Sequence, residues 1–592
     1  MKIKRLIALG AVVAAGALVL AGCSTTASSE VVSGTSVSVA QNSAFSSLNA
    51  NTTTGNSTYN QNIIYMTSSS FNYYDNTPKL IKNTKFGTYK VVSKSPLTIK
   101  YTINEGVKWS DGTPVNASDM LLNWASSISK YNDPTGVNFT SVYAGTGFDL
   151  ITKTPKISDG GRSITFVYDK PYVDWELNPI VNMPAASTYE LAGLGKKTGT
   201  AAQDAVVKAI QDNDTATLKK LANAWANGFN FNGMPSNKAA LVTDGPFVIS
   251  KLVKNQYVTL TANKNYNWGP LPKVQNITVR FIPDQTAQVQ ALQNGEIGII
   301  YGQATSDTVA ALKQLKNVTT TTTPTSDYEH IDLTFNNGGP FDPATYGGDA
   351  TKALEVRQAF FKTIPRDEII SRLIKPLASN IKPDNSATFI PGQAGYDQSV
   401  QSNGSAAYDK VDIAGAKALL AKAGVTGPVN VRFAYANDNP RREGEFQLVQ
   451  ASAKEAGFNV IDVGKPTADF FGDSGIGSGK YNYDATVFAW SYTSLARTGA
   501  ESQFVTGGNS NFNGYSNKQV DSDFKTLETT TDEAKQVSLL QSIDKQSWGD
   551  AMSMILFQLP DVTAHSNTIA NVSDAPLVPN VFWNFFDWKV KK

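Results

Sequence analysis

The chain has 592 residues, and its 52 lysines and arginines nearly balance its 50 aspartates and glutamates, so the formal net charge is only +2. A nearly neutral chain gives no indication of nucleic acid or of a strongly charged partner. Its length exceeds what one hydrophobic core organises, so two or three domains are expected. Cys23 is the only cysteine, which excludes an internal disulfide.

The N-terminus has the pattern of an export signal. Lys2, Lys4 and Arg5 precede an uncharged apolar run at residues 6–20, which is shorter than the roughly 20 residues of a membrane-spanning helix. The sequence Leu-Ala-Gly-Cys ends at Cys23 and resembles the lipobox of bacterial lipoproteins. This resemblance implies cleavage before Cys23, attachment of lipid to its sulfur, and a protein anchored to the cell membrane on the extracytoplasmic side. The alternative is a buried apolar cysteine, but Cys23 lies at a signal boundary rather than in a packed segment.

After a small polar tether at residues 23–34, strand and helix patterns mix throughout, so the fold class is α/β or α+β. Alternation of apolar and polar residues predicts strands at 35–41, 97–104, 163–168, 247–260 (two strands), 277–282, 429–435 and 458–463. Apolar spacing predicts helices at 116–130, 201–227, 286–293, 353–363, 412–423 and 441–456. Asn116 or Ser118 is the predicted N-cap of the first of these helices.

Residues 472–475, Gly-Asp-Ser-Gly, resemble the nucleophile motif of trypsin-like serine proteases. That chemistry needs a histidine base and an orienting acid, but His330 and His565 are the only histidines and neither lies in a companion motif. A glycine-rich loop therefore explains the segment better than catalysis does. So few histidines and cysteines also leave little for a zinc site. We expect no metal and no cofactor, although an all-carboxylate calcium site stays open.

Four longer blocks carry a family resemblance in one order along the chain. The first, at 101–119, contains Gly-Val-Lys-Trp-Ser-Asp-Gly-Thr-Pro-Val. The second, at 244–297, contains Gly-Pro-Phe, Asn-Lys-Asn-Tyr-Asn-Trp and Gly-Glu-Ile. The third, at 335–370, contains Val-Arg-Gln-Ala-Phe and Arg-Asp-Glu-Ile-Ile, and the fourth, at 408–424, contains Ala-Lys-Ala-Leu-Leu. Together they resemble the peptide/nickel class of bacterial extracellular solute-binding proteins, family 5.

The resemblance implies an α/β, two-lobed periplasmic-binding-protein-like fold of class II type, with an extra α/β subdomain and a ligand cleft between the lobes. The implied division is a signal peptide at 1–22, a tether at 23–34, lobe I at 35–62, an extra subdomain at 63–240, lobe I at 241–320, lobe II at 321–540 and lobe I at 541–592. The resemblance implies no catalysis. A monomer would capture a solute, close its cleft and deliver the solute to the permease and ATPase subunits of an ABC importer.

Family position places the ligand contacts at three points: the loop after the first strand, a strand end in the second lobe, and a segment that contains a tryptophan. Aromatic side chains at such points give apolar contact, while polar groups fix orientation. The predicted ligand-binding residues are Phe45, Asn56, Tyr59, Tyr435, Asn437, Asp438, Trp490, Ser491 and Tyr492. The alternative for Tyr435 and Trp490 is an ordinary core position at a strand end.

The charge clamps of the family's peptide binders are not evident. The aspartate that those members carry after the tryptophan is missing, because no acid stands between Trp490 and Glu501. Phe433, Ala434 and Tyr435 occupy the region of the expected arginine, and arginines follow only at the start of the next helix. Oligopeptides are the leading cargo, with oligosaccharides or another neutral solute as the alternative. Outside transport, the alternatives are a surface hydrolase and a sensor or adhesin that keeps the binding fold.

Overall fold

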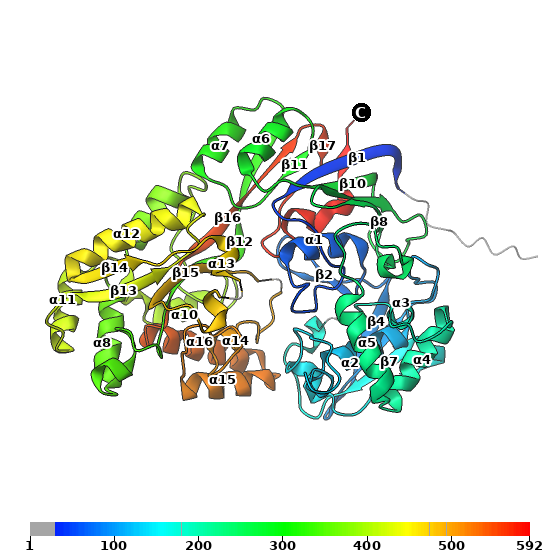
Figure 1. Cartoon of the computed structure of the whole chain (residues 1–592), viewed down its shortest axis with the longest axis horizontal. Coiled ribbons are helices and arrows are strands. Elements are labelled where there is room, and N and C mark those ends of the chain that lie inside the picture. The colour runs from blue at the N-terminus through cyan, green and yellow to red at the C-terminus, as the bar shows by residue number, and fades with distance from the viewer. Residues whose placement is uncertain (1–29, 179, 473, 493, 592) are drawn as a thin grey trace, which may run out of the picture.

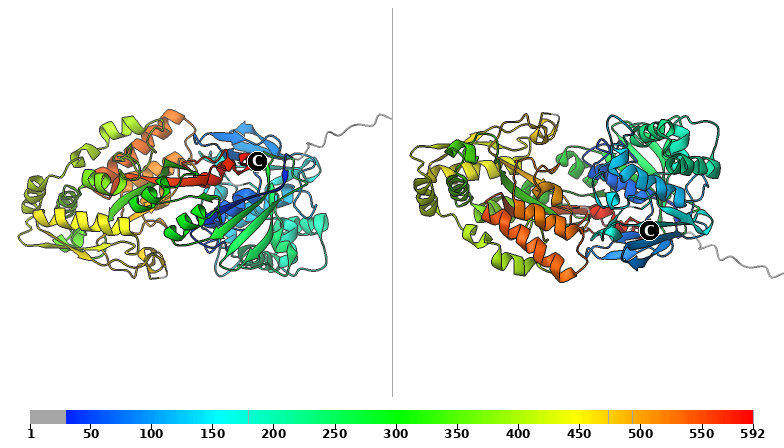
Figure 2. Two further views of the ribbon diagram at one scale, coloured as in Figure 1. Left: turned by 90° about the horizontal axis from the view of Figure 1, so that it is seen from above. Right: turned by 90° about the horizontal axis from the view of Figure 1, so that it is seen from below.

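The computed structural model describes residues 30–178, 180–472, 474–492 and 494–591. The predicted signal peptide at 1–22, the predicted lipid site Cys23 and residues 24–29 of the tether lie outside these ranges. Figure 1 shows two lobes beside each other, and the views from above and below in Figure 2 show the same division along the longest axis. No helix within the described ranges is long and apolar enough to cross a membrane.

One mixed ten-stranded sheet includes strands of both lobes. In order across the sheet its strands are β14 (Phe458–Asp462), β13 (Val429–Ala434), β15 (Ala485–Trp490), β12 (Val318–Leu333), β16 (Ser553–Ser566), β11 (Ile299–Ile300), β1 (Val32–Gln41), β10 (Val274–Phe281), β9 (Tyr257–Ala262) and β8 (Phe247–Val253). β1 runs parallel to β10 and β11, whereas β12 runs antiparallel to β15 and β16.

The long strands β12 and β16 carry the chain between the lobes, and Figure 1 shows them crossing there. They pair with each other along most of their lengths. The register breaks between Pro324 and Tyr328, in the middle of β12. Within this break the N–H of Ser326 donates to the carbonyl of Pro576 at 2.9 Å. The strands therefore form one connection with an irregularity at its middle, and hydrogen bonds hold that irregularity in place.

A separate four-stranded sheet lies in the first half of the chain, in the order β4 (Gly87–Lys94), β5 (Leu97–Ile103), β7 (Ser163–Val167) and β6 (Lys156–Ser158). Buried and partly exposed residues alternate along β5, as the pattern at 97–104 predicts. Two short pairs complete the strands of the described ranges: β2 (Asn72–Tyr74) with β3 (Leu80–Lys82), and β17 (Ile569–Ala570) with β18 (Lys589–Val590).

The α-helices are α1 (Thr58–Thr67), α2 (Ala117–Ser127), α3 (Ala185–Leu191), α4 (Gly199–Gln211), α5 (Thr215–Asn227), α6 (Gln285–Gln293), α7 (Ser306–Lys313), α8 (Ala350–Phe361), α9 (Arg366–Ile369), α10 (Tyr396–Ser402), α11 (Ile413–Lys422), α12 (Pro440–Ala456), α13 (Thr467–Phe470), α14 (Glu501–Phe504), α15 (Lys518–Glu528) and α16 (Glu533–Gly549). The N-cap of α2 is Asn116, and Asp119 completes a capping box. The helical stretch predicted at 201–227 is two helices, because Asn213, with a φ of 51°, interrupts it.

Two large hydrophobic clusters correspond to the two lobes. The first combines residues from β1 and the four-stranded sheet with Phe582 and Trp588 near the C-terminus, and we call the part built on it lobe I. The second extends from Tyr328 to Leu559, and we call the part built on it lobe II. The boundary predicted at residue 541 falls inside α16, which packs in the second cluster, so the chain returns to lobe I along β16.

A buried ionic network fixes β12 to the start of α12. The carboxylate of Glu329 on β12 is fully buried and lies 3.0 Å from Nη2 of Arg441 and 2.8 Å from Nε of Arg442. Burial raises the pKa of Glu329, but the two arginines outweigh it and leave the pKa below its ordinary value. Arg441 also pairs with Glu445 one turn later in α12. Each buried charge therefore faces an opposite charge.

Replacing Glu329 with glutamine should lower the free energy of unfolding by about 3–5 kcal/mol, because two buried arginines lose their main counter-charge. Urea unfolding of the variant and the unmodified chain measures this difference. Glu296→Gln is the matched control: Glu296 pairs with Arg280 at the surface, where the two side chains are 51% and 37% exposed. The control should cost at most about 1 kcal/mol. Equal effects of both substitutions would contradict the importance of the buried network.

Candidate ligand-binding site

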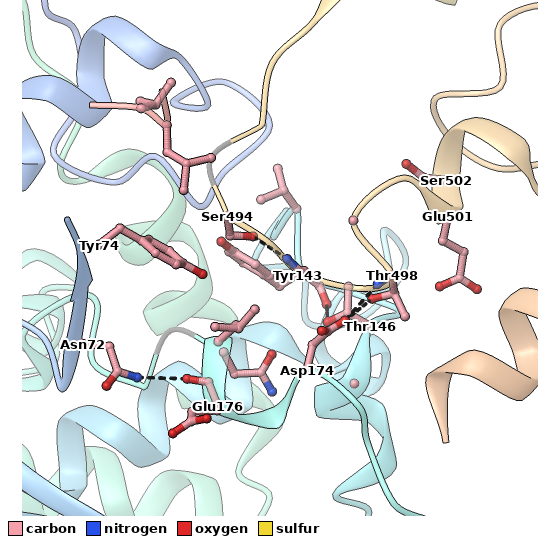
Figure 3. Close-up of a pocket in the computed structure, with 18 of the residues that line it drawn as sticks. Asn72, Tyr74, Tyr143, Thr146, Asp174, Glu176, Ser494, Thr498, Glu501 and Ser502 are labelled. Atoms are coloured by element: carbon pink, nitrogen blue, oxygen red, sulfur yellow. Dashed lines mark hydrogen bonds between the residues drawn. The ribbon is translucent and has the colours of Figure 1, made fainter. Parts of the chain in front are cut away.

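A cavity of about 840 Å³ lies between the two lobes. Lobe I contributes parts of α1 and β2 and residues from the segments 142–147, 172–178 and 575–583. Lobe II contributes residues from the segment 494–509, which follows β15, and Glu528 at the end of α15. Figure 3 shows part of this lining, with side chains from both lobes facing the same space. A ligand in this cavity would therefore touch both lobes at once.

Aromatic side chains form much of the lobe I wall. Tyr74 at the end of β2, Tyr143, Tyr172 and Trp583 all line the cavity. Gly147 is needed beside them, because a Cβ at this position would lie 2.3 Å from the ring of Tyr172. The wall thus offers flat apolar faces together with phenolic hydroxyl groups, a combination suited to organic ligands that also carry polar groups.

Asp174 of lobe I forms the main polar contact between the walls. Its carboxylate accepts hydrogen bonds from the backbone N–H groups of Arg497 and Thr498, at 2.8 and 2.9 Å, and from the Thr498 hydroxyl at 2.8 Å. Asp174 is only 4% exposed, and Figure 3 shows its contact with Thr498. Nearby, the N–H of Val173 donates to the carbonyl of Glu528 at 2.8 Å. These bonds hold the lobe II loop against lobe I.

The charged residues that line the cavity are all acidic: Asp75, Asp174, Glu176, Glu501 and Glu528, with no lysine, arginine or histidine in the described lining. Three of them have partners within the protein. Asp75 accepts N–H groups of its own turn, and Asp174 holds the lobe II loop. The carboxylate of Glu176 accepts from the Tyr89 hydroxyl and lies 3.0 Å from Nζ of Lys82. The other two acids, Glu501 and Glu528, therefore determine the electrostatic potential in their part of the cavity.

Among the described residues, no ion pair or hydrogen bond is made by the carboxylates of Glu501 and Glu528. Burial, together with the negative charges of Glu528 and Asp174, raises the pKa of Glu501 to about 7. Burial also raises the pKa of Glu528, although Lys170 offsets part of this effect. In Figure 3 the carboxylate of Glu501 extends from α14 without reaching another labelled side chain. This part of the cavity therefore favours positive charge.

Five of the sequence-predicted site residues lie away from this cavity. Phe45 and Tyr435 are buried, the first against Phe231 in lobe I and the second stacked on Phe446 in lobe II. The other three, Asn56, Asn437 and Asp438, are exposed on loops. Asp438 accepts hydrogen bonds from the N–H and hydroxyl of Thr467. None of the five is part of the cavity lining.

The other four predicted residues lie nearer the crossing of the lobes, but they do not line the cavity either. Trp490 is half-buried against the rings of Phe488 and Phe512, with ring centroids 5.1 and 5.8 Å away. Ser491 is exposed, and the hydroxyl of Tyr492 donates to a backbone carbonyl. Tyr59 on α1 is half-buried. As ligand contacts, all nine residues remain predictions.

Two features of the sequence could have indicated residues that line the cavity. One is the aromatic run Asn-Tyr-Tyr of β2, and the other is the glycine-rich segment 142–147, which contains Tyr143. The lobe II wall begins at Ser494, only four positions after Trp490. The predicted Trp490 segment and the lobe II wall of the cavity are therefore neighbours in the sequence.

Comparison with known proteins identifies the family. The family model of the bacterial extracellular solute-binding proteins, family 5 (middle region), matches residues 77–512. The chain belongs to this family. An uncharacterized lipoprotein of Mycobacterium tuberculosis is 23% identical over 92% of this chain and 91% of its own length. The oligopeptide-binding protein OppA of the same organism is 24% identical over 82% of this chain and 73% of its own length.

Two solved structures confirm the predicted two-lobed α/β fold. The periplasmic EDTA-binding protein EppA matches with a TM-score of 0.78 at 20% identity, covering 94% of this chain and 96% of that chain. The oligopeptide-binding protein AppA from Bacillus subtilis, in complex with a nonapeptide, matches with a TM-score of 0.70 at 17% identity, covering 94% and 99%. The same fold thus holds chemically different ligands in different solute-binding proteins.

Replacing Asp174 with alanine should speed hydrogen–deuterium exchange at the amides of Arg497 and Thr498 by about tenfold or more. A hydrogen bond to a charged acceptor contributes about 1.5–3 kcal/mol, and its loss frees these amides. Mass spectrometry of a peptide covering residues 495–500 measures the rate. Asp75→Ala is the matched control, because Asp75 accepts N–H groups within lobe I only. Unchanged exchange in Asp174→Ala would show that the carboxylate does not hold the loop.

Replacing Glu501 with glutamine should stabilise the protein at pH 8 by about 1–3 kcal/mol, since each pKa unit corresponds to about 1.4 kcal/mol. The folded-state pKa of about 7 lies above the ordinary 4.5, so the ionised carboxylate opposes folding above that range. Below pH 4.5 the glutamate is protonated in both states, and the gain should vanish. Urea unfolding at pH 8 and pH 4 measures both values, with Glu176→Gln, which removes a paired carboxylate, as the control. A gain that is the same at both pH values would refute this explanation.

Proposed function

We propose that the protein is the substrate-binding lipoprotein of an ABC importer, and that it captures oligopeptides between its lobes for delivery to a membrane permease. The observation that carries this proposal is the large cavity bounded by both lobes, with aromatic walls, in a member of a solute-binding family. OppA, a relative, is named for oligopeptide binding, and AppA, of the same fold, holds a nonapeptide. Cys23 would carry the lipid, a role supported by the lipoprotein name of another relative.

The cavity chemistry favours a peptide over an anionic chelate. EppA is named for binding EDTA, which is strongly negative in solution. Here an anion would meet five carboxylates and no cationic side chain in the described lining. A peptide offers a positive amino terminus to Glu501 or Glu528, and it offers backbone donors and acceptors to the serines and threonines of the 494–509 segment. Oligosaccharides or another neutral solute remain the second candidate, because the aromatic walls also suit stacking on sugar rings.

In the proposed mechanism, the ligand is captured when the two lobes close on it. A ligand stabilises the closed state only by the contacts that it makes in that state and not in the open one. A peptide that spans the cavity gains contacts to Tyr74 and Tyr143 of lobe I and to Ser502 of lobe II only when the lobes meet. The bonds that Asp174 makes to the lobe II loop add to closure without contacting the ligand. The closed shape is then the form that a permease would recognise.

Native mass spectrometry of the purified protein, followed by calorimetry with peptide and oligosaccharide libraries, tests this proposal. We expect co-purified peptides and saturable peptide binding with dissociation constants in the micromolar range or below. Saturable binding of sugars alone would replace the peptide cargo by the second candidate. Turnover of the bound ligand that disappears in Ser474→Ala would instead favour a hydrolase.

Two alanine variants locate the bound peptide. Tyr143→Ala should weaken binding about tenfold or more, because a buried aromatic contact contributes about 1–3 kcal/mol. Trp490→Ala tests the position predicted from the sequence, and it should weaken binding without unfolding the protein if that surface also contacts the ligand. Tyr257→Ala, on β9 and outside the cavity lining, serves as the control. A loss in Trp490→Ala with none in Tyr143→Ala would move the site away from the cavity.

A further inference from the structure

A second cavity of about 270 Å³ lies in lobe I beside the large one. Residues of α1 and β2 line both cavities, so the smaller one is a side pocket of the cleft. The shared residues are Gln61, Tyr65, Ser70, Asn72, Tyr73 and Tyr143. A group that projects from a ligand in the cleft could enter this side pocket without leaving the main cavity.

Aromatic rings dominate the walls of the side pocket: Tyr65, Tyr73, Tyr266, Phe585 and Phe586. Tyr65 packs edge-on against Phe585 with ring centroids 5.8 Å apart, and Phe585 packs against Phe586 at 5.4 Å. The hydroxyl of Tyr266 accepts from the Ser69 hydroxyl at 3.1 Å. Such walls suit an apolar chain, and their negative ring faces also attract a cation.

One buried acid, Asp244, also lines the side pocket. It is 1% exposed, and its Oδ1 accepts from the backbone N–H of Ser69 at 2.9 Å. Its Oδ2 has no hydrogen-bond partner among the described residues. The indole N–H of Trp268 also donates to the Asp244 backbone carbonyl at 2.7 Å. The contacts of Oδ1 and of this carbonyl are explained if Asp244 only holds its own segment in place. Such a role does not account for Oδ2.

Nothing in the described lining neutralises this carboxylate, because the side pocket contains no lysine, arginine or histidine. The negative charge of another acid, Asp119, also acts on Asp244. Burial, with a smaller contribution from Asp119, raises the pKa of Asp244 to about 8. An uncompensated carboxylate inside an aromatic pocket is costly, and a cation from outside would remove that cost.

We propose that the side pocket is a subsite for a cationic group on an apolar stem, and that it receives a lysine or arginine side chain of the peptide bound in the cleft. This assignment rests on the proposed peptide function. The stem packs against Tyr73 and Phe586, while the charged head meets Asp244 Oδ2 in a charge-assisted hydrogen bond. A neutral side chain of equal length leaves Oδ2 unpaired, and an acidic one is repelled.

The pH dependence of binding follows from the groups around Asp244. Tyr65 and Tyr266 from the packed walls have raised pKa values because they are buried, so they stay neutral below pH 10. Burial likewise raises the pKa of Tyr73, and that of Asp119 to about 6. The cation binds the ionised form of Asp244, which gains population as pH rises towards 8. Affinity for a cationic side chain should therefore rise between pH 6 and pH 8.5.

Calorimetry with the peptides Ala-Ala-Lys-Ala-Ala and Ala-Ala-norleucine-Ala-Ala tests the subsite. At pH 8.5 the unmodified protein should bind the lysine peptide about tenfold more tightly or better, and the preference should shrink at pH 6. Asp244→Asn should reduce the preference to less than about twofold, chiefly because the variant binds the lysine peptide more weakly. Asp212→Asn removes the same charge from the exposed end of α4, and it should keep the full preference.

A lysine preference that survives in a folded Asp244→Asn variant would overturn the proposal. If that variant does not fold, Tyr73→Leu provides the second test, because it removes one aromatic wall and should lower the lysine preference about threefold. Equal binding of both peptides by the unmodified protein would refute the subsite alone. Binding of neither peptide, nor of any other peptide in the library, would refute the peptide function and the subsite with it.

Discussion

The antiparallel pairing of β12 with β16 is the constraint on which the two-lobed arrangement depends. Its backbone hydrogen bonds belong to one sheet that includes strands of both lobes, so the lobes cannot separate without breaking the ladder. The register break in β12 is the least regular part of the ladder. There the N–H of Ser326 donates to the carbonyl of Pro576, which lies within the cavity-lining segment 575–583. The connection that joins the lobes therefore also positions one wall of the cleft.

Buried carboxylates are paired with arginines inside lobe II but are unpaired in the cleft and the side pocket. Glu329 is fully buried, but Arg441 and Arg442 neutralise it and so fix β12 to α12 within lobe II. Glu501 in the cleft and Asp244 in the side pocket are also withdrawn from water, yet no cationic side chain in the described lining faces them. Both carboxylates have raised pKa values for this reason. An unpaired buried carboxylate lowers the stability of the folded protein. In the proposed function, a cationic group of the ligand would pair with it and remove this penalty.

Local features of the fold could be predicted from the sequence, whereas features that depend on distant partners could not. The N-cap Asn116 and the alternation of β5 need only neighbouring residues. β12 contains a run of threonines and Pro324 without clear alternation, and its pairing partner lies more than 200 residues away. The predicted Trp490 segment lies four positions before Ser494, where the lobe II wall begins, but its role in binding stays a prediction. Which side chains face the cavity depends on the loop's path, and that path is held by Asp174 of the other lobe.

Closure links these charges to selectivity. Asp174 is buried with three donors that satisfy its carboxylate, whereas Glu501 and Glu528 have no such donors among the described residues. In the proposed mechanism, repulsion between Asp174 of lobe I and Glu501 of lobe II would therefore oppose closure of an empty cleft. A ligand that brings positive charge removes this opposition, and a negative ligand increases it. Because a ligand shifts the equilibrium only by its different affinity for the two states, the discrimination due to Glu501 and Glu528 would arise in the closing step of the proposed mechanism.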